Sequence, residues 1–439
     1  MKTRLQIISI TTLIILMIAS CNLPIPETVN SAGEPISVQT IPTTQASKNP
    51  PLEHRIRVRV ANGIGEFYDT STGLKFVPRG MNYIVMGLQQ NRAGEQSVSH
   101  ATFAPSFYNR ETAGQALVDM HSAGYNTVRL FIETTTTSSI SGTKVGLSDP
   151  YLDNVADFIG LAAASDMFVI FVTDWIADSD PYNQIIAREC CEAFDSSNAV
   201  HLSASGVEAS RRFYRDFVSE LIERDARLDH VFSFNVSNEL AFDSNEPPLV
   251  WTSGTVTLGN GQSYDMSKPE DKSRIIDDGL VYYIDQVRAG ILGVDPTSLV
   301  GVGFFAPQKP HPHRIGDPRV IRTYPAIWQS QVDYVDLHGY PNPADLTLGQ
   351  LVDNYEIDGM QVKPIILGEY GAFTFAFSNP QAAALALRSW QVESCRYGFD
   401  GWLMWTWDNE FNGEMFSALS DGGAINGALA PVLNPDPCK

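Results

Sequence analysis

Two glutamates, Glu239 and Glu369, each follow a short apolar run of the sequence. The runs, residues 231–236 and 364–367, are rich in β-branched or aromatic side chains, as expected for short buried strands. An unpartnered buried carboxylate is costly, but one at the carboxyl end of a parallel strand lies where barrels build active sites. Two carboxylates there can cleave a glycosidic bond. For either glutamate alone, a salt bridge or a helix cap is the alternative.

Strands and helices alternate along the rest of the chain, which is the pattern of a parallel sheet. Strands are predicted at residues 76–84, 126–133, 168–175, 231–239, 299–305, 332–340, 363–370 and 401–407. Helices are predicted at residues 111–123, 151–165, 207–228, 273–290 and 381–397. The fold class is therefore α/β, a (β/α)₈ barrel preceded by a β-hairpin that begins at residue 55, with a last helix that is short or missing.

Several short motifs fall on these strands or at their ends. They are Arg79-Gly80-Met81-Asn82, Arg129, Asn238-Glu239, His338-Gly339-Tyr340, Gly368-Glu369 and Trp405. Each motif alone is weak, but their order over residues 55–430 resembles that of the retaining glycoside hydrolases of the cellulase superfamily, especially family 5. The resemblance implies that Glu239 is the general acid/base and Glu369 the nucleophile.

The other polar motif residues have expected roles beside this pair. Arg129 is suited to hold Glu369 ionised by a charge-assisted hydrogen bond, with a structural ion pair as the alternative. Asn238 is suited to hydrogen-bond the sugar 2-hydroxyl, an interaction that strengthens in the transition state, with a strand-end cap as the alternative. Asn82 is expected to line the same site.

The aromatic motif residues complete the expected site. Tyr340 is placed to orient Glu369, and His338 to contact the sugar or the nucleophile, with buried packing as the alternative for both. Trp405 offers a flat face to a pyranose ring. Trp402 and Trp407 share its strand, and at least one of these three tryptophans is expected in the core.

One position departs from the family pattern. Family members usually carry a histidine at the end of strand three, where this chain has Asp174 and Trp175. Either residue is a candidate to fill that space, which leaves the preferred sugar open. His311 and His313 flank a proline that stiffens their spacing, and no third ligand is indicated, so we expect a loop or substrate contact there and neither a metal nor a cofactor.

The N-terminal residues have the features of an export signal. Two basic residues precede an apolar stretch that ends in Ala19-Ser20-Cys21, which resembles a bacterial lipobox. We expect a lipoprotein signal peptide at residues 1–20, lipidation of Cys21, a Pro/Ser/Thr-rich linker at residues 21–52 and a catalytic domain at residues 53–439. A plain signal peptide or a transmembrane anchor is the alternative.

Composition limits the partners. The net charge of −20 opposes binding to nucleic acid, and the expected membrane contact is the lipid anchor alone. We expect an exported monomer, anchored at the cell surface or secreted. Cys438 is expected to form a disulfide that pins the tail, with Cys395, Cys190 or Cys191 as its partner.

Together these features predict an enzyme that hydrolyses β-glycosidic bonds, most simply β-1,4 bonds of β-mannan or β-glucan, with retention. Whether it cuts within the polymer or from its end depends on loops such as residues 85–108 and 243–270. A surface lipoprotein that binds carbohydrate without catalysis is one alternative. A transglycosylase that uses the same residues is another.

Overall fold

The computed structural model describes residues 52–142, 144–187, 196–304, 319–320, 328–342, 346–359, 362–408 and 413–438. Several expectations from the sequence lie outside these residues. They concern the signal peptide, Cys21, the linker up to residue 51, Cys190, Cys191, His311 and His313.

Eight parallel strands form the predicted (β/α)₈ barrel. The last strand pairs with the first and so closes the barrel. The fifth strand is divided in two: its first half pairs with the fourth strand and its second half with the sixth. The interruption in the fifth strand falls at Val302. The strands are β3 (Arg79–Asn82), β6 (Thr127–Phe131), β7 (Phe168–Val172), β8 (Val231–Asn235), β12 (Val300–Gly301), β13 (Gly303–Phe304), β15 (Val335–His338), β16 (Ile365–Phe373) and β17 (Phe399–Trp405).

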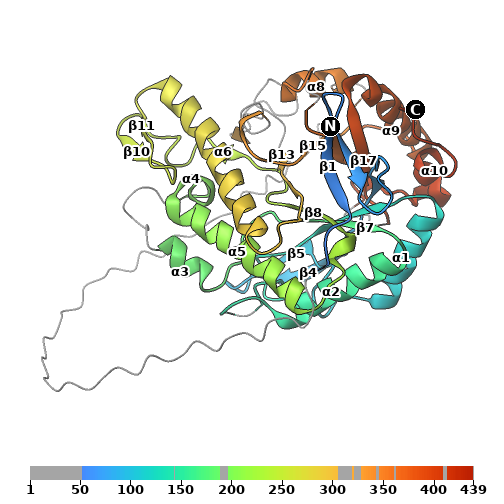
Figure 1. The fold of residues 1–439 in the computed structure, drawn as a ribbon, viewed down its shortest axis with the longest axis horizontal. Helices are drawn as coiled ribbons and strands as arrows, with labels where there is room; N and C mark the ends of the chain where they lie inside the picture. Colours follow the sequence, from blue (N-terminus) through green and yellow to red (C-terminus); the bar gives the residue numbers. More distant parts are fainter. Residues whose placement is uncertain are drawn as a thin grey trace, which may run out of the picture. The chain divides into compact units, whose positions relative to one another are not determined.

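Helices follow the strands along the chain and surround the labelled strands β7, β8, β15 and β17 in Figure 1. In α5, Phe213, Phe217 and Leu221 recur at helical spacing and are buried, while Ser203 caps the first turn by accepting from the backbone N–H of Gly206. The helices are α1 (Arg110–Ser122), α2 (Asp149–Ala164), α3 (Tyr182–Ile186), α4 (Ala199–Leu202), α5 (Ala204–Glu223), α6 (Pro269–Leu292), α8 (Leu348–Tyr355), α9 (Pro380–Ser394) and α10 (Ser420–Leu429).

The N-terminal hairpin predicted from the sequence is present and closes one end of the barrel. Its strands, β1 (Ile56–Ala61) and β2 (Ile64–Asp69), pair antiparallel. Phe67 of this hairpin packs edge-to-face on Phe232 and Tyr334, with ring centroids 5.0 and 5.4 Å apart. Because Phe232 is the second residue of β8, the hairpin seals the amino ends of the strands and leaves the carboxyl ends open.

Several short strands were not predicted from the sequence. The segment after β3 folds into a second hairpin, β4 (Met86–Gln90) with β5 (Gln96–His100). The segment after β8 contains β9 (Phe242–Asp243) and the hairpin of β10 (Thr255–Thr257) with β11 (Ser263–Asp265). Two further short strands are β14 (Arg319–Val320), which pairs with β9, and β18 (Met415–Phe416), which pairs with β16.

Strand four ends earlier than predicted. Its ladder stops at Asn235, so Asn238 and Glu239 lie in the connection beyond it. The connection still follows the fifth strand closely, because the N–H of Gly303 donates to the carbonyl of Ser237 at 2.9 Å. A Cβ on Gly303 would lie 1.8 Å from the carbonyl oxygen of Asn238, so only glycine permits this approach.

The C-terminal tail is fastened to the barrel. The short last helix, α10, is followed by a disulfide between Cys438 and Cys395, the residue that begins the 3₁₀ helix η4 (Cys395–Tyr397). The guanidinium of Arg79 donates to the backbone carbonyls of Leu429 and Asn434 at 3.1 and 2.9 Å. Among the described residues, the helices are too short or too polar to cross a membrane.

Candidate active site

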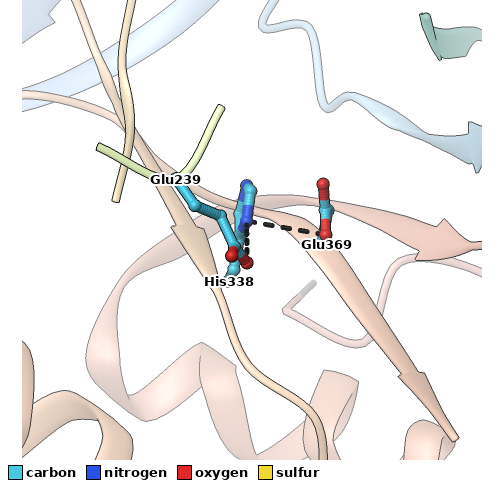
Figure 2. A group of neighbouring side chains, drawn as sticks. All are labelled: Glu239, His338 and Glu369. Atoms are coloured by element: carbon cyan, nitrogen blue, oxygen red, sulfur yellow. Dashed lines mark hydrogen bonds and ion pairs between the residues drawn. The ribbon is translucent and has the colours of Figure 1, made fainter. Parts of the chain in front are cut away.

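The two glutamates singled out by the sequence lie together, Glu239 beyond the end of β8 and Glu369 where the pairing of β16 with β15 ends. Glu369 belongs to β16 and is buried, whereas Glu239 follows β8 and is half-buried. One oxygen of each carboxylate and a ring nitrogen of His338 all lie within 4.8 Å of one another. Figure 2 shows His338 with a dashed interaction to each glutamate.

Both oxygens of Glu369 accept a short hydrogen bond. Nη1 of Arg129 donates to Oε1 at 2.7 Å, and the hydroxyl of Tyr340 donates to Oε2 at 2.7 Å. Burial and the negative charges of Glu369 and Glu239 raise the pKa of Tyr340 well above its ordinary value, so it remains a donor. Donors on both oxygens stabilise the ionised carboxylate and fix its orientation.

Arg129 organises the floor of the site. Its Nη1 also donates to Oδ1 of Asn82 at 3.0 Å, its Nη2 donates to Oδ1 of Asn238 at 2.8 Å, and its Nε lies 3.4 Å from Oδ2 of Asp336. Burial alone would lower the pKa of Arg129, but the negative charges of Glu369 and Asp336 outweigh it and raise the pKa above its ordinary value. The guanidinium therefore stays charged although it is fully buried.

Arg129 makes the hydrogen bond to Glu369 that was expected from the sequence, and Asn82, which was expected to line the site, lies against Arg129. The exposed fraction of both residues is 0%, so neither offers surface to a ligand. Asn82 instead positions Arg129 and donates from Nδ2 to the carbonyl oxygen of Gly368 at 2.9 Å. Asn82 lies at the carboxyl end of β3, next to the guanidinium of Arg129, which explains this supporting role.

His338 lies between the two carboxylates. Its Nδ1 is 3.0 Å from Oε1 of Glu239 and 3.5 Å from Oε2 of Glu369. Burial alone would lower the pKa of His338, but the charges of Glu369 and Asp336 and the hydrogen bond to Glu239 raise it to about 10.

Asp336 was not identified from the sequence. It is fully buried in β15, and Nδ2 of Asn235 donates to its Oδ2 at 2.6 Å. A Cβ on Gly368 would lie 1.7 Å from Oδ1 of Asp336, so glycine next to Glu369 leaves the room that this second acid occupies. The signal that could have found Asp336 is its parity, because it shares the inward face of the strand with His338.

A pocket of about 450 Å³ adjoins Glu239. Asp174 and Trp175 line it at the end of strand three, so both occupy the region where the family pattern has histidine. Loss of hydration and the charges of Glu133, Glu239 and Glu369 raise the pKa of Asp174 to about 7. The Asp174 side chain remains accessible to water, so the neighbouring negative charges are the cause of the shift that its exposure leaves in place.

Aromatic residues extend from both sides of the site. Trp405 is half-buried and packs edge-on against Phe131, with ring centroids 5.7 Å apart, whereas Trp402 and Trp407 are core residues. On the side of Tyr340, a line of rings leads outward to solvent. Tyr340 and Phe373 have centroids 5.2 Å apart, Phe373 stacks on Phe375 at 5.1 Å, and Phe375 is 72% exposed.

Comparison with solved structures supports the fold. The chain is similar to an endo-1,4-β-mannanase from Rhizomucor miehei, with a TM-score of 0.57, 14% identity, and 86% of this chain and 99% of that chain covered. It is also similar to an exo-β-1,4-mannosidase from Opitutaceae bacterium strain TAV5, with a TM-score of 0.52, 14% identity and 83% of this chain covered. The match spans only 60% of that mannosidase chain.

A third similar structure is a glycoside hydrolase family 5 mannosidase from Rhizomucor miehei, with a TM-score of 0.51, 11% identity, and 87% of this chain and 98% of that chain covered. No protein-family model matches the sequence, and no curated protein matches it significantly. At these identities the likeness establishes the barrel fold, and the chemistry has to be argued from the site itself.

Proposed function

We propose that this chain is a β-glycoside hydrolase that cleaves β-1,4-linked glycans with retention of configuration. The observation that carries this proposal is the pair Glu239 and Glu369, whose nearest oxygens lie within 4.8 Å at the open end of the barrel. Retaining enzymes need carboxyl groups about 5–5.5 Å apart, and inverting enzymes need roughly 6.5–9.5 Å for a water molecule between them. Oxygens within 4.8 Å place the two carboxylates close to each other, and we propose on this basis that one of them attacks directly.

The surroundings of each carboxylate support a role for it. Glu369 accepts from Arg129 and Tyr340, so it is the ionised nucleophile that attacks the anomeric carbon while Glu239 protonates the leaving oxygen. Glu239 then removes a proton from the incoming water, and that water releases the sugar from Glu369. Asn238, held by Arg129 and half-buried, is suited to hydrogen-bond the sugar 2-hydroxyl.

The proposed role of Glu239 requires a proton on its carboxyl group before the first step. The carboxylate of Glu369 favours that form, because one oxygen of each residue lies within 4.8 Å of the other and two negative charges so close together repel each other. A neutral Glu239 is the form that a general acid must have before the first step.

Mannan is the first substrate to test, because the similar structures include mannan-degrading enzymes. The experiment measures sugar release by residues 53–439 from mannans, glucans, xylans and aryl β-glycosides, beside the Glu369→Gln variant. The exposed Glu414→Gln serves as the matched control. We expect release from a β-1,4 glycan, at least about a thousandfold slower in Glu369→Gln, and a first product of unchanged anomeric configuration by NMR.

Two other outcomes have distinct meanings. Binding of glycans without release by either protein would favour the carbohydrate-binding lipoprotein. Transfer of the glycosyl unit to a second sugar, in preference to water, would favour transglycosylation by the same two glutamates. Normal turnover in Glu369→Gln would contradict the nucleophile assignment.

We also propose an N-terminal membrane tether, with residues 1–20 removed, Cys21 lipidated and residues 21–52 acting as a spacer. The lipobox-like Ala19-Ser20-Cys21 supports this. The protein would then act as a monomer on extracellular glycan at a cell surface. Metabolic labelling with a fatty-acid analogue tests the proposal, because label should be present in the full chain and absent from Cys21→Ser.

A further inference from the structure

The unpredicted hairpin β4–β5 brings a histidine into the pocket beside Glu239. Met86, Val98 and His100 of the hairpin line one part of the pocket, and Asp174, Trp175 and Glu239 are among the residues lining the rest. The mechanism proposed above uses none of the hairpin residues. His100 is the ionisable residue among them.

The hairpin is fixed to the barrel, so its pocket residues are held in place. The buried amide of Gln89 donates to the carbonyl of His100 at 2.9 Å and accepts from the hydroxyl of Thr136 at 2.9 Å. The N–H of Thr137 donates to the carbonyl of Gln90 at 2.8 Å. A ligand that enters the pocket therefore meets a preorganised wall, which lowers the entropic cost of binding.

The His100 ring is also fixed, and it touches the aromatic residues of the site. It stacks on Phe131 with centroids 4.1 Å apart and an interplanar angle of 6°, and it meets Trp405 edge-on at 6.5 Å. The guanidinium of Arg129 lies over the same Phe131 ring, 5.2 Å from its centroid. These contacts place His100 next to the residues that hold Glu369.

The polar atoms of His100 lack partners. Its Nδ1 is buried and makes no hydrogen bond, and its ring forms none to any described residue. Burial and the positive charge of Arg129 lower the pKa of His100 to about 4, so the ring is neutral at neutral pH. A neutral imidazole carries one N–H, and because buried unsatisfied N–H groups are rarer than unsatisfied acceptors, the hydrogen belongs on Nε2.

We propose that His100 is a glycan-binding residue, whose Nε2–H donates to a hydroxyl of the sugar bound beside Glu239. Strand three carries no histidine that could contact a sugar in this pocket. The hydrogen bond from His100, on the hairpin after strand one, would provide a polar contact there instead. Asp174 accepts from hydroxyls, and Trp175, 43% exposed, offers an apolar face to the same sugar. This inference rests on the proposed function and names a substrate contact for it.

The test measures binding to the hexasaccharide of whichever polymer the wild-type protein cleaves. Calorimetry compares Glu369→Gln with Glu369→Gln/His100→Phe, because phenylalanine preserves the stacking on Phe131 and removes both nitrogens. His121→Phe, at an exposed histidine of α1, is the matched control. We expect His100→Phe to weaken binding about 3- to 10-fold, as for loss of one neutral hydrogen bond, and His121→Phe to leave it unchanged.

A second measurement distinguishes a direct contact between His100 and the sugar from an effect of the substitution on the fold. In Glu369→Gln labelled with ¹⁵N at histidine, the His100 signals are identified by their loss in His100→Phe. We expect ¹⁵N chemical shifts typical of a neutral ring that carries its hydrogen on Nε2. We also expect the chemical shift of Nε2 to change when the hexasaccharide saturates the protein. Unchanged affinity in His100→Phe, or an Nε2 signal that does not move at saturation, overturns the inference. A wild-type protein that neither binds nor cleaves any glycan overturns the proposed function instead.

Discussion

The imidazole of His338 lies 3.0 Å from the carboxylate of Glu239, with which it forms a partly buried hydrogen bond. The histidine thereby couples the candidate acid to Glu369, the candidate nucleophile, 3.5 Å from the same nitrogen. Protonation of His338 is therefore a property of the whole site, and its consequences for stability are measurable.

The stability of the protein should depend on pH through His338. Its pKa is raised from 6.5 to about 10 in the folded state, so its contribution is complete below pH 6.5 and disappears as the pH rises to about 10. We expect the difference in unfolding free energy between wild type and His338→Asn to shrink by more than about 2 kcal/mol over this interval. Urea unfolding at pH 6, 8 and 10 measures it. A constant difference would contradict the charge assigned to His338.

Loss of the Arg129 charge should destabilise the barrel. Arg129→Met would leave Glu369 and Asp336 buried without their shared cation, and breaking such a pair costs about 3–5 kcal/mol. We expect a lower urea midpoint and no measurable glycan hydrolysis. Arg211→Met, at a half-exposed arginine of α5, should change stability by less than about 1 kcal/mol. Equal effects of the two substitutions would argue against a central role for Arg129.

The disulfide between Cys395 and Cys438 should stabilise the fold. It closes a loop across 43 residues and pins the C-terminal tail, and removal of such a bridge costs about 2–4 kcal/mol. Cys438→Ser should therefore unfold at a lower urea concentration than the oxidised wild type. Dithiothreitol should produce the same decrease in wild type and none in the variant. If dithiothreitol also lowered the urea midpoint of Cys438→Ser, a different bond sensitive to reduction would be responsible.

The exposed ring of Phe375 should bind polymer. It continues the line of rings that begins at Tyr340, so it can stack on a sugar unit remote from the bond that breaks. We expect Phe375→Ala to raise the KM for a long glycan about 3- to 10-fold and to leave hydrolysis of a short aryl glycoside unchanged. Leu385→Ala, equally exposed on α9, is the control. Loss of activity on both substrates would indicate damage to the site itself.

The eight strands were predictable because each apolar run matches a barrel strand. The two glutamates could be selected because each follows such a run. The ends of the strands were less predictable: the run at residues 231–236 continues past the ladder, which stops at Asn235. Where a strand loses its partner depends on the neighbouring strand, which no local pattern contains.

The parts of the site that sequence reasoning missed depend on tertiary contacts. The β4–β5 hairpin alternates weakly and turns at residues 91–95 without the Asn-Gly or Asp-Gly pair that marks short hairpins. His100 therefore gave no indication of a role. Asn82 is buried because the large side chain of Arg129 packs against it. Cys395 pairs with Cys438 because α9 ends where the C-terminal tail passes.

Gly368 limits how this protein can be altered by mutation. Every other residue would place a Cβ on the carboxylate of Asp336, which shares Arg129 with Glu369. A library that varies the residues around the nucleophile should therefore keep position 368 as glycine and search Asp174, Trp175 and the β4–β5 hairpin instead. Sugar preference can change along that wall of the pocket while the chemistry beneath it stays intact.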